Sequence, residues 1–227
     1  MSSVFVSHRV YESVLKLLKS FSADPILIHD LPEIDSRTAY HADLSLCVLG
    51  DTIVCAPSLF EKIANIKNYK VIKGKYEPCE PYPKDILYNA AVVGEYLFCN
   101  LLKTDPVLLE VAEMKGFKTI DVKQGYTRCS TLVVNSSALI TSDNGIHSVA
   151  LNCGVDSLLV SNEDVVLEGY PHGFIGGTGG VFENKMIFCG DVSKHRDFRK
   201  IKEFCGKYSV EIFYTSEPLR DFGSVLC

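Results

Sequence analysis

The fold is decided by the stretch of residues 44–72, whose pattern returns three more times along the chain. It reads LSLCVLG (44–50), DTIVCAP (51–57), a helical segment (58–65) and YKVI (69–72). The two apolar runs meet at Gly50-Asp51, a residue pair of the kind that tight hairpin turns require. The stretch therefore predicts a strand, a tight turn, a second strand, a helix and a third strand.

The same order of elements recurs in the rest of the chain. The turns of the other copies are predicted at Gly94-Glu95, Asn135-Ser136 and Glu183-Asn184. Their helices are predicted over residues 105–115, 143–152 and 196–207, with N-cap side chains at Asp105, at Asp143 and at Asp191 or Ser193. Four copies of one unit are therefore visible.

A fifth copy is divided between the two ends of the chain. Residues 223–227 predict its first strand, and residues 4–7, 10–21 and 25–29 predict its second strand, helix and third strand. A C-terminal strand that only the N-terminus can complete implies a closed ring, whereas a linear solenoid needs polar caps at both ends. We expect one α/β domain over residues 1–227, a five-bladed, pseudo-fivefold α/β-propeller. The alternative, a doubly wound sheet, does not suit consecutive hairpins before each helix.

Composition excludes several classes of function. The chain has 227 residues, of which 47% are hydrophobic and 22% charged, as in ordinary globular proteins. A net charge of -5 favours no nucleic-acid partner. The apolar runs are too short to span a membrane, and the N-terminus lacks the features of a signal peptide, so we expect a soluble, cytoplasmic protein without a membrane partner. The nine cysteines form no C-x-x-C pair, which favours reduced thiols over disulfides or structural zinc.

Equivalent positions of the units carry polar side chains. The residues just before the five first strands are Asp43, Asp85, Cys129, Gly173 and Asp221. In a closed fan they would converge on one axis, and His41 would share a face with Asp43 if that segment is extended. Crowded carboxylates need a cation among them, and a planar guanidinium can bind two of them. A thiol beside a cation becomes the nucleophilic thiolate, so the set predicts attack on a bound guanidinium.

At these residues the chain resembles the penteins, which include arginine and agmatine deiminases, dimethylarginine hydrolases and amidinotransferases. His41-Ala42-Asp43 resembles their His-x-Asp segment, and GYTRCST (125–131), two units later, resembles their glycine-led segment that ends in Cys-x-Thr or Cys-x-Ser. DFGSVL (221–226) is similar to their Asp/Glu-Gly-Gly-Asp stretch, although Phe222 and Ser224 replace a glycine and an acid. This order of segments requires a circular permutation, which a closed ring tolerates.

The resemblance implies a guanidino-group-modifying hydrolase or an amidinotransferase-like enzyme. The expected catalytic residues are Cys129 as nucleophile, His41 as general acid and base, and Asp221 as an acidic partner. The residues expected to bind substrate are Asp43, Asp85 and Asn89. Cys129 follows Lys123 and Arg128, which favour a thiolate. We expect no cofactor and no metal, and the implied partner is a small guanidinium- or amidine-containing molecule.

Each of these interpretations has an alternative. Cys129 could be a packed thiol, His41-Ala42-Asp43 a surface turn, Asp221 a backbone cap and Asn89 a structural amide. The chain could then be a non-catalytic pentein that binds a protein or a ribosome, as the ribosome anti-association factors do, or a module that binds a guanidinium without chemistry. The glycines from 173 to 180 lack the Lys-Ser/Thr that follows a phosphate-binding loop, so we expect them to allow close packing at the axis. The oligomeric state stays open.

Overall fold

The computed structural model describes residues 2–227, which form a mixed α/β fold of five small sheets. The N-terminal sheet pairs β1 (Ser2–Ser7) with β2 (Ala23–Ile28). The other four sheets are β3 (Leu46–Leu49), β4 (Thr52–Cys55) and β5 (Lys70–Lys73); β6 (Ala91–Val93), β7 (Tyr96–Cys99) and β8 (Lys118–Asp121); β9 (Thr131–Asn135), β10 (Ala138–Thr141) and β11 (Asp156–Leu159); and β12 (Gly179–Phe182), β13 (Lys185–Phe188) and β14 (Glu211–Tyr214). In each of these four, the first strand is antiparallel to the second and the third is parallel to it.

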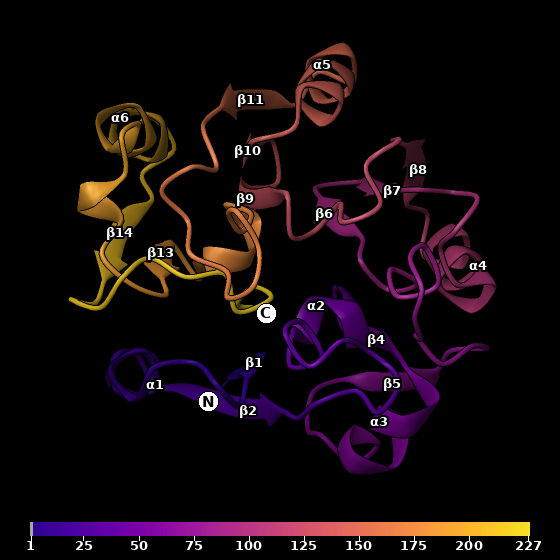
Figure 1. Ribbon diagram of the computed structural model, residues 1–227. Coiled ribbons are helices and arrows are strands. Elements are labelled where there is room, and N and C mark those ends of the chain that lie inside the picture. The colour runs from indigo at the N-terminus through magenta and orange to yellow at the C-terminus, as the bar shows by residue number, and fades with distance from the viewer. Residues whose placement is uncertain (1) are drawn as a thin grey trace.

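One helix connects the second and third strands of every unit. The helices of this kind are α1 (Glu12–Ser20), α3 (Pro57–Ile63), α4 (Pro106–Met114), α5 (Asn144–Asn152) and α6 (Phe198–Lys207). Short helical turns stand at α2 (Ala42–Ser45), at Gly176–Thr178 and at Val192–Lys194. Figure 1 shows the five sheets side by side around the middle of the molecule, with the five connecting helices at the periphery.

The local sequence signals explain these elements. Gly50 and Gly94 adopt positive φ angles of 68° and 58° at the predicted turns, a conformation that glycine reaches without steric cost. The Asp105 side chain accepts a hydrogen bond from the Val107 amide at the start of α4, and Asp143 caps α5 in the same way. The four predicted strand-turn-strand-helix-strand units are confirmed.

The two ends of the chain meet, but not as a full strand pair. Phe5 and Leu226 form an isolated antiparallel bridge, with N···O distances of 2.8 and 3.0 Å. The expected strand over residues 223–227 is therefore reduced to one bridge. The reason is that Gly223 and Ser224 have φ angles of 76° and 73°, which an extended strand cannot contain.

Burial changes from strand to strand within each three-stranded sheet. The second strands of the three-stranded sheets are almost wholly buried, whereas the third strands are partly exposed. Each first strand has a partly exposed valine between buried neighbours; the four valines are Val48, Val92, Val133 and Val181. The first strands thus present one side to the core and one side to a space in the middle.

The glycines between 173 and 180 allow very close packing, as expected. A β-carbon on Gly176 would lie 2.4 Å from the carbonyl oxygen of Arg128. One on Gly177 would lie 1.8 Å from a carboxylate oxygen of Asp221. These segments approach one another at distances that only glycine permits.

The helices of this fold are short. Over residues 2–227, none combines the length and the apolar character that crossing a bilayer demands.

The contact between β12 and the C-terminal segment yields a stability prediction. A β-carbon on Gly180 would lie 2.0 Å from the carbonyl oxygen of Val225, and backbone atoms cannot yield as a flexible side chain does. We expect Gly180→Ala to lower the free energy of unfolding by about 1–3 kcal/mol, measured by urea denaturation. Gly206→Ala is the control, because Gly206 is exposed in α6 with open space around it, and it should raise stability by about 0.5–1 kcal/mol. Equal effects of the two changes would contradict the close contact.

Candidate active site

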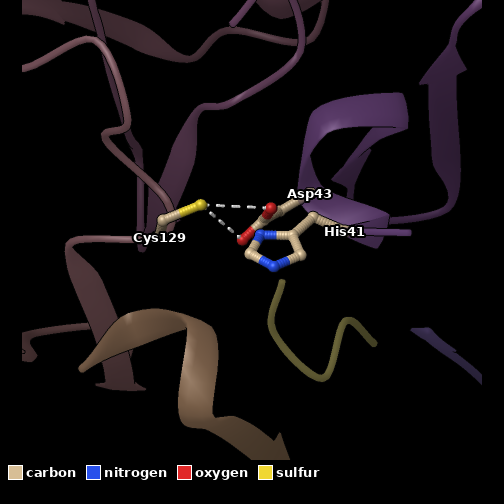
Figure 2. A group of neighbouring side chains, drawn as sticks. All are labelled: His41, Asp43 and Cys129. Carbon is tan, nitrogen blue, oxygen red and sulfur yellow. Dashed lines mark hydrogen bonds between the residues drawn. The ribbon is translucent and has the colours of Figure 1, made fainter. Parts of the chain in front are cut away.

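Residues far apart in the sequence meet near the middle of the molecule. His41 directly precedes α2, Asp43 lies within it, and Cys129 stands just before β9. Their nitrogen, oxygen and sulfur atoms all lie within 4.8 Å of one another (Figure 2). The condition of an extended segment at residues 41–43 is met only by His41, because Asp43 is in a helical turn, yet the turn still brings both side chains into the cluster.

Asp43 is the hydrogen-bonding centre of the cluster. The thiol of Cys129 lies 3.2 Å from both carboxylate oxygens of Asp43 (Figure 2). The Ser224 hydroxyl donates to the same carboxylate at 2.6 Å. The Asn89 amide group lies 3.2 Å from the Cys129 sulfur and also donates to the Asp43 carbonyl at 3.1 Å. Asp43 and Ser224 are fully buried or nearly so, so this network is shielded from water.

Asp221 supports the histidine from the C-terminal segment. One oxygen of its buried carboxylate lies 3.7 Å from Nδ1 of His41. The carboxylate accepts hydrogen bonds from the backbone amides of Phe174 at 2.9 Å and Gly223 at 3.0 Å. The other ring nitrogen, Nε2 of His41, is buried and has no hydrogen-bond partner within residues 2–227. Asp221 therefore caps backbone amides and faces the imidazole at the same time.

Burial sets the protonation states of the cluster. It lowers the pKa of His41 to about 4 and raises the pKa of Asp221 to about 6, because both charged forms lose hydration. It also raises the pKa of Asp43. The pKa of Cys129 is raised well above its usual value, first by burial and then by the neighbouring charge of Asp43. At neutral pH the cluster therefore holds a neutral imidazole and a protonated thiol that donates to Asp43.

The expected activation of Cys129 by Lys123 and Arg128 is wrong, because the pKa of this thiol is raised. Lys123 is exposed, and the guanidinium of Arg128 donates to the carbonyl oxygens of Thr131, Gly176 and Val225. Neither side chain contacts the thiol. A sequence neighbour of a cysteine can point away from it, and Arg128 does so.

Asp85 was expected to lie with Asp43 and Cys129, but its side chain is not part of their cluster. Its carboxylate accepts a hydrogen bond from the Tyr126 hydroxyl, and its other oxygen is buried without a partner within residues 2–227. Burial raises the pKa of Asp85. Asn89, from the same unit, does reach Cys129, so this unit contributes its amide in place of its acid.

A pocket of about 230 Å³ opens onto the thiol. His41, Cys129 and Asp221 are the catalytic candidates that line it. Its other walls are mainly aromatic and aliphatic: Leu44, Tyr126, Leu167, Tyr170, Pro171 and Phe174, with Thr38 and His172. Sequence reasoning missed these walls. The one available signal was Tyr126, which lies inside the segment that carries Cys129.

The chemistry of the cluster limits what can occupy it. Imidazole nitrogen, carboxylate oxygen and thiolate sulfur are all zinc ligands, so His41, Asp43 and Cys129 could hold a metal ion. The pocket lining also holds the carboxylate of Asp221, with neither lysine nor arginine among the lining residues. An organic cation would supply the missing positive charge.

Comparison with solved structures shows which fold this is. The chain is similar to dimethylarginine dimethylaminohydrolase from Pseudomonas aeruginosa, a cysteine-to-serine mutant complexed with citrulline, with a TM-score of 0.58 and 8% identity over 95% of this chain and 92% of that one. It is also similar to inosamine-phosphate amidinotransferase from Streptomyces griseus (TM-score 0.55, 11% identity, 100% and 93% covered). A third similar structure is agmatine deiminase from C. jejuni, with a TM-score of 0.53 and 9% identity over 95% of this chain and 87% of that one. At such identities the likeness concerns the fold, and the chain has the pentein-superfamily fold.

Sequence comparisons point to one family. A search of curated proteins finds no match. The family described as "Family of unknown function (DUF6873)" matches residues 5–226, nearly the whole length, and the chain therefore belongs to this family.

Proposed function

We propose that this protein is a cysteine-dependent enzyme that cleaves a C–N bond of a small guanidinium or amidine, by hydrolysis or by transfer of the amidino group. The observation that carries the proposal is the pocket on Cys129, whose floor holds a thiol, an imidazole and a buried carboxylate and whose lining includes no cation. Asp43 lies directly behind the thiol. A planar guanidinium or amidinium would lie against the thiol, the imidazole and the carboxylate on this floor.

A guanidinium suits this floor better than an ammonium ion. Its planar N–H groups can donate to two carboxylates at once; Asp221 lines the pocket, and Asp43 lies behind the Cys129 thiol without lining it. Its positive charge also opposes the two effects that raise the pKa of Cys129, the loss of hydration and the charge of Asp43. Substrate binding itself therefore favours the thiolate.

The reaction follows from these positions. The thiol proton of Cys129 passes to the neutral imidazole of His41, and the sulfur forms a bond to the central carbon of the guanidinium. His41 then gives its proton to the departing nitrogen as the C–N bond breaks, which leaves an amidino group on sulfur. In hydrolysis, His41 takes a proton from water, the oxygen attacks the carbon, the C–S bond breaks and the proton on His41 returns to the sulfur of Cys129. In transfer, an amine replaces the water.

The named neighbours support this class of reaction. They are a dimethylarginine dimethylaminohydrolase, an amidinotransferase and an agmatine deiminase, and each name describes chemistry at a guanidino group. The alternative, a non-catalytic fan that binds a protein or a ribosome, leaves the pocket over the thiol and the unpaired His41 nitrogen without a role.

The walls of the pocket favour an apolar substrate tail. Tyr126 and Phe174 form a tilted aromatic pair with ring centroids 6.1 Å apart, and no arginine or lysine lines the pocket to bind a carboxylate. Arg37 lies over the ring of Tyr170, but its guanidinium is paired with Asp35. We infer that N-alkyl or N-aryl guanidines fit better than guanidino amino acids.

The architecture proposed for this enzyme is one domain over residues 1–227, a circularly permuted, five-bladed α/β-propeller. The bridge between Phe5 and Leu226 supports it, because it joins the N-terminal sheet to the end of the chain. The apolar cluster that contains Val4 and Val6 from β1 together with Ile187 and Val225 supports it as well.

The proposal predicts selective labelling of Cys129. Chloroacetamidine carries a cationic amidine, so it should modify Cys129 at least about tenfold faster than any of the other eight cysteines, whereas neutral chloroacetamide should show no such preference. Peptide mapping after short exposures measures this. Asp43→Asn should remove the preference, and Asp51→Asn, which changes an exposed turn carboxylate, should keep it. A Cys129 that reacts no faster than its neighbours would sink the enzyme hypothesis.

The walls of the pocket predict substrate preference. The kcat/KM for propylguanidine should exceed that for arginine by at least about tenfold, because the carboxylate of arginine would be buried without a partner. Release of ammonia or amine, with the matching urea product, measures the rate. Cys129→Ser should abolish turnover, and a chelator should leave it unchanged. Loss of activity on chelation would instead indicate a metal at His41, Asp43 and Cys129.

The buried imidazole predicts a pH dependence of stability. The pKa of His41 is about 4 in the folded protein against 6.5 for a free imidazole, so the unfolded chain gains a proton first and stability is lost as the pH falls from 6.5 to 4. Asp221, with a pKa raised to about 6, takes up a proton in the folded state and offsets part of this loss. The stability advantage of the wild type over His41→Gln should therefore shrink by about 3 kcal/mol over this range in urea titrations. Parallel curves would show that the imidazole is not held neutral.

A further inference from the structure

A second pocket, of about 300 Å³, lies at the other end of the first strands from Cys129. Cys129 stands before β9, whereas Asn135, the last residue of β9, lines this second pocket. Glu183 and Asn184, which follow β12 at its hairpin turn, line it as well. We call it the axial pocket.

The walls of the axial pocket repeat from unit to unit. Every first strand contributes its partly exposed valine, and these are Val48, Val92, Val133 and Val181. Val225 and Leu226 of the C-terminal segment complete the ring of aliphatic side chains. The acidic residue at the rim, Glu183, is paired with Lys185 at 2.8 Å. Asn135, Asn184, Tyr208 and Cys227 line the pocket too, so its walls combine the aliphatic ring with polar groups.

One buried cation lines the axial pocket. Arg128 is only 7% exposed, and its guanidinium donates to the carbonyl oxygens of Thr131 at 2.6 Å, Gly176 at 3.3 Å and Val225 at 3.4 Å. It forms no ion pair with a carboxylate within residues 2–227. The charge of Asp43 raises the pKa of Arg128 across space, but the two side chains form no hydrogen bond. A buried charge with only neutral partners is costly, and an anion in the pocket would relieve that cost.

Arg128 and Cys129 are neighbours in the sequence, but their side chains line different pockets. Cys129 lines the pocket that also holds His41 and Asp221, whereas Arg128 lines the axial pocket. Asn89 holds the backbone between them, because its side-chain oxygen accepts from the amide of Arg128 at 2.7 Å and from that of Cys129 at 3.3 Å. The same short segment therefore supplies a thiol to one site and a cation to another.

We propose that the axial pocket is a second binding site, which takes a small aliphatic carboxylate: the guanidinium of Arg128 binds the carboxylate group and the ring of valines packs around the hydrocarbon chain. A guanidinium matches a carboxylate through paired hydrogen bonds. The aliphatic ring within these walls favours a ligand with a short alkyl chain over a bare inorganic anion. This site is independent of the reaction proposed at Cys129.

Hexanoate is the probe for this proposal. Calorimetric titration of the full chain at neutral pH should show one saturable site for hexanoate. Hexan-1-ol, which lacks the carboxylate, and inorganic phosphate, which lacks the alkyl chain, should each bind at least about tenfold more weakly. Arg128→Gln should abolish binding, and Arg199→Gln, which removes an exposed arginine of α6, should not change it. No saturable hexanoate binding to the wild type overturns the proposal, as does phosphate binding more tightly than hexanoate.

A second variant covers the case in which Arg128→Gln fails to fold. Val181→Phe fills the axial pocket and leaves Arg128 in place, so it should weaken hexanoate at least about tenfold. Val149→Phe, on the partly buried face of α5, is the matched control and should bind normally. Cys129→Ser should also bind normally, which separates this site from the catalytic proposal. Unchanged binding in Val181→Phe, or lost binding in Cys129→Ser, places the carboxylate elsewhere and overturns the proposal.

Discussion

The buried carboxylate of Asp43 is the group on which the centre of this protein depends. It accepts from the Cys129 thiol and the Ser224 hydroxyl, while Asn89 holds its backbone carbonyl. A carboxylate without water stays in a folded protein only when its oxygens have donors or it takes up a proton. These donors come from segments far apart in the sequence, so the cluster exists only when the sheets are assembled. Stability and chemistry therefore share the same few contacts.

The middle of the molecule separates charges of opposite sign. Acidic groups lie on the side of Cys129, and Arg128 faces the other side. The two sides are not insulated, because the positive charge of Arg128 lowers the pKa of Asp43 against the larger effect of burial.

Much of the fold could be predicted from the sequence, because hairpin turns and helix caps are local signals. Gly50, Gly94 and Asp143 do in the structure what their residue types indicate. The gathering of His41, Asp43 and Cys129 also followed from the repeat. Asp85 did not, because its hydrogen bond to Tyr126 depends on a contact between units that spacing does not encode. The protonation of Cys129 was missed for a related reason: it depends on depth of burial and on where Arg128 points.

The bridge between Phe5 and Leu226 has a consequence for the synthesis of the chain. The apolar residues of β1 and α1, such as Val4, Val14 and Leu18, pack with residues near the other end, such as Ile187 and Val225. A ribosome makes residues 4–18 well before it makes their packing partners around residues 187–225. That apolar surface must wait uncovered while nearly the whole polypeptide emerges, and contacts so distant in sequence form slowly. Residues 4–18 thus reach their native packing only after these distant partners have been made.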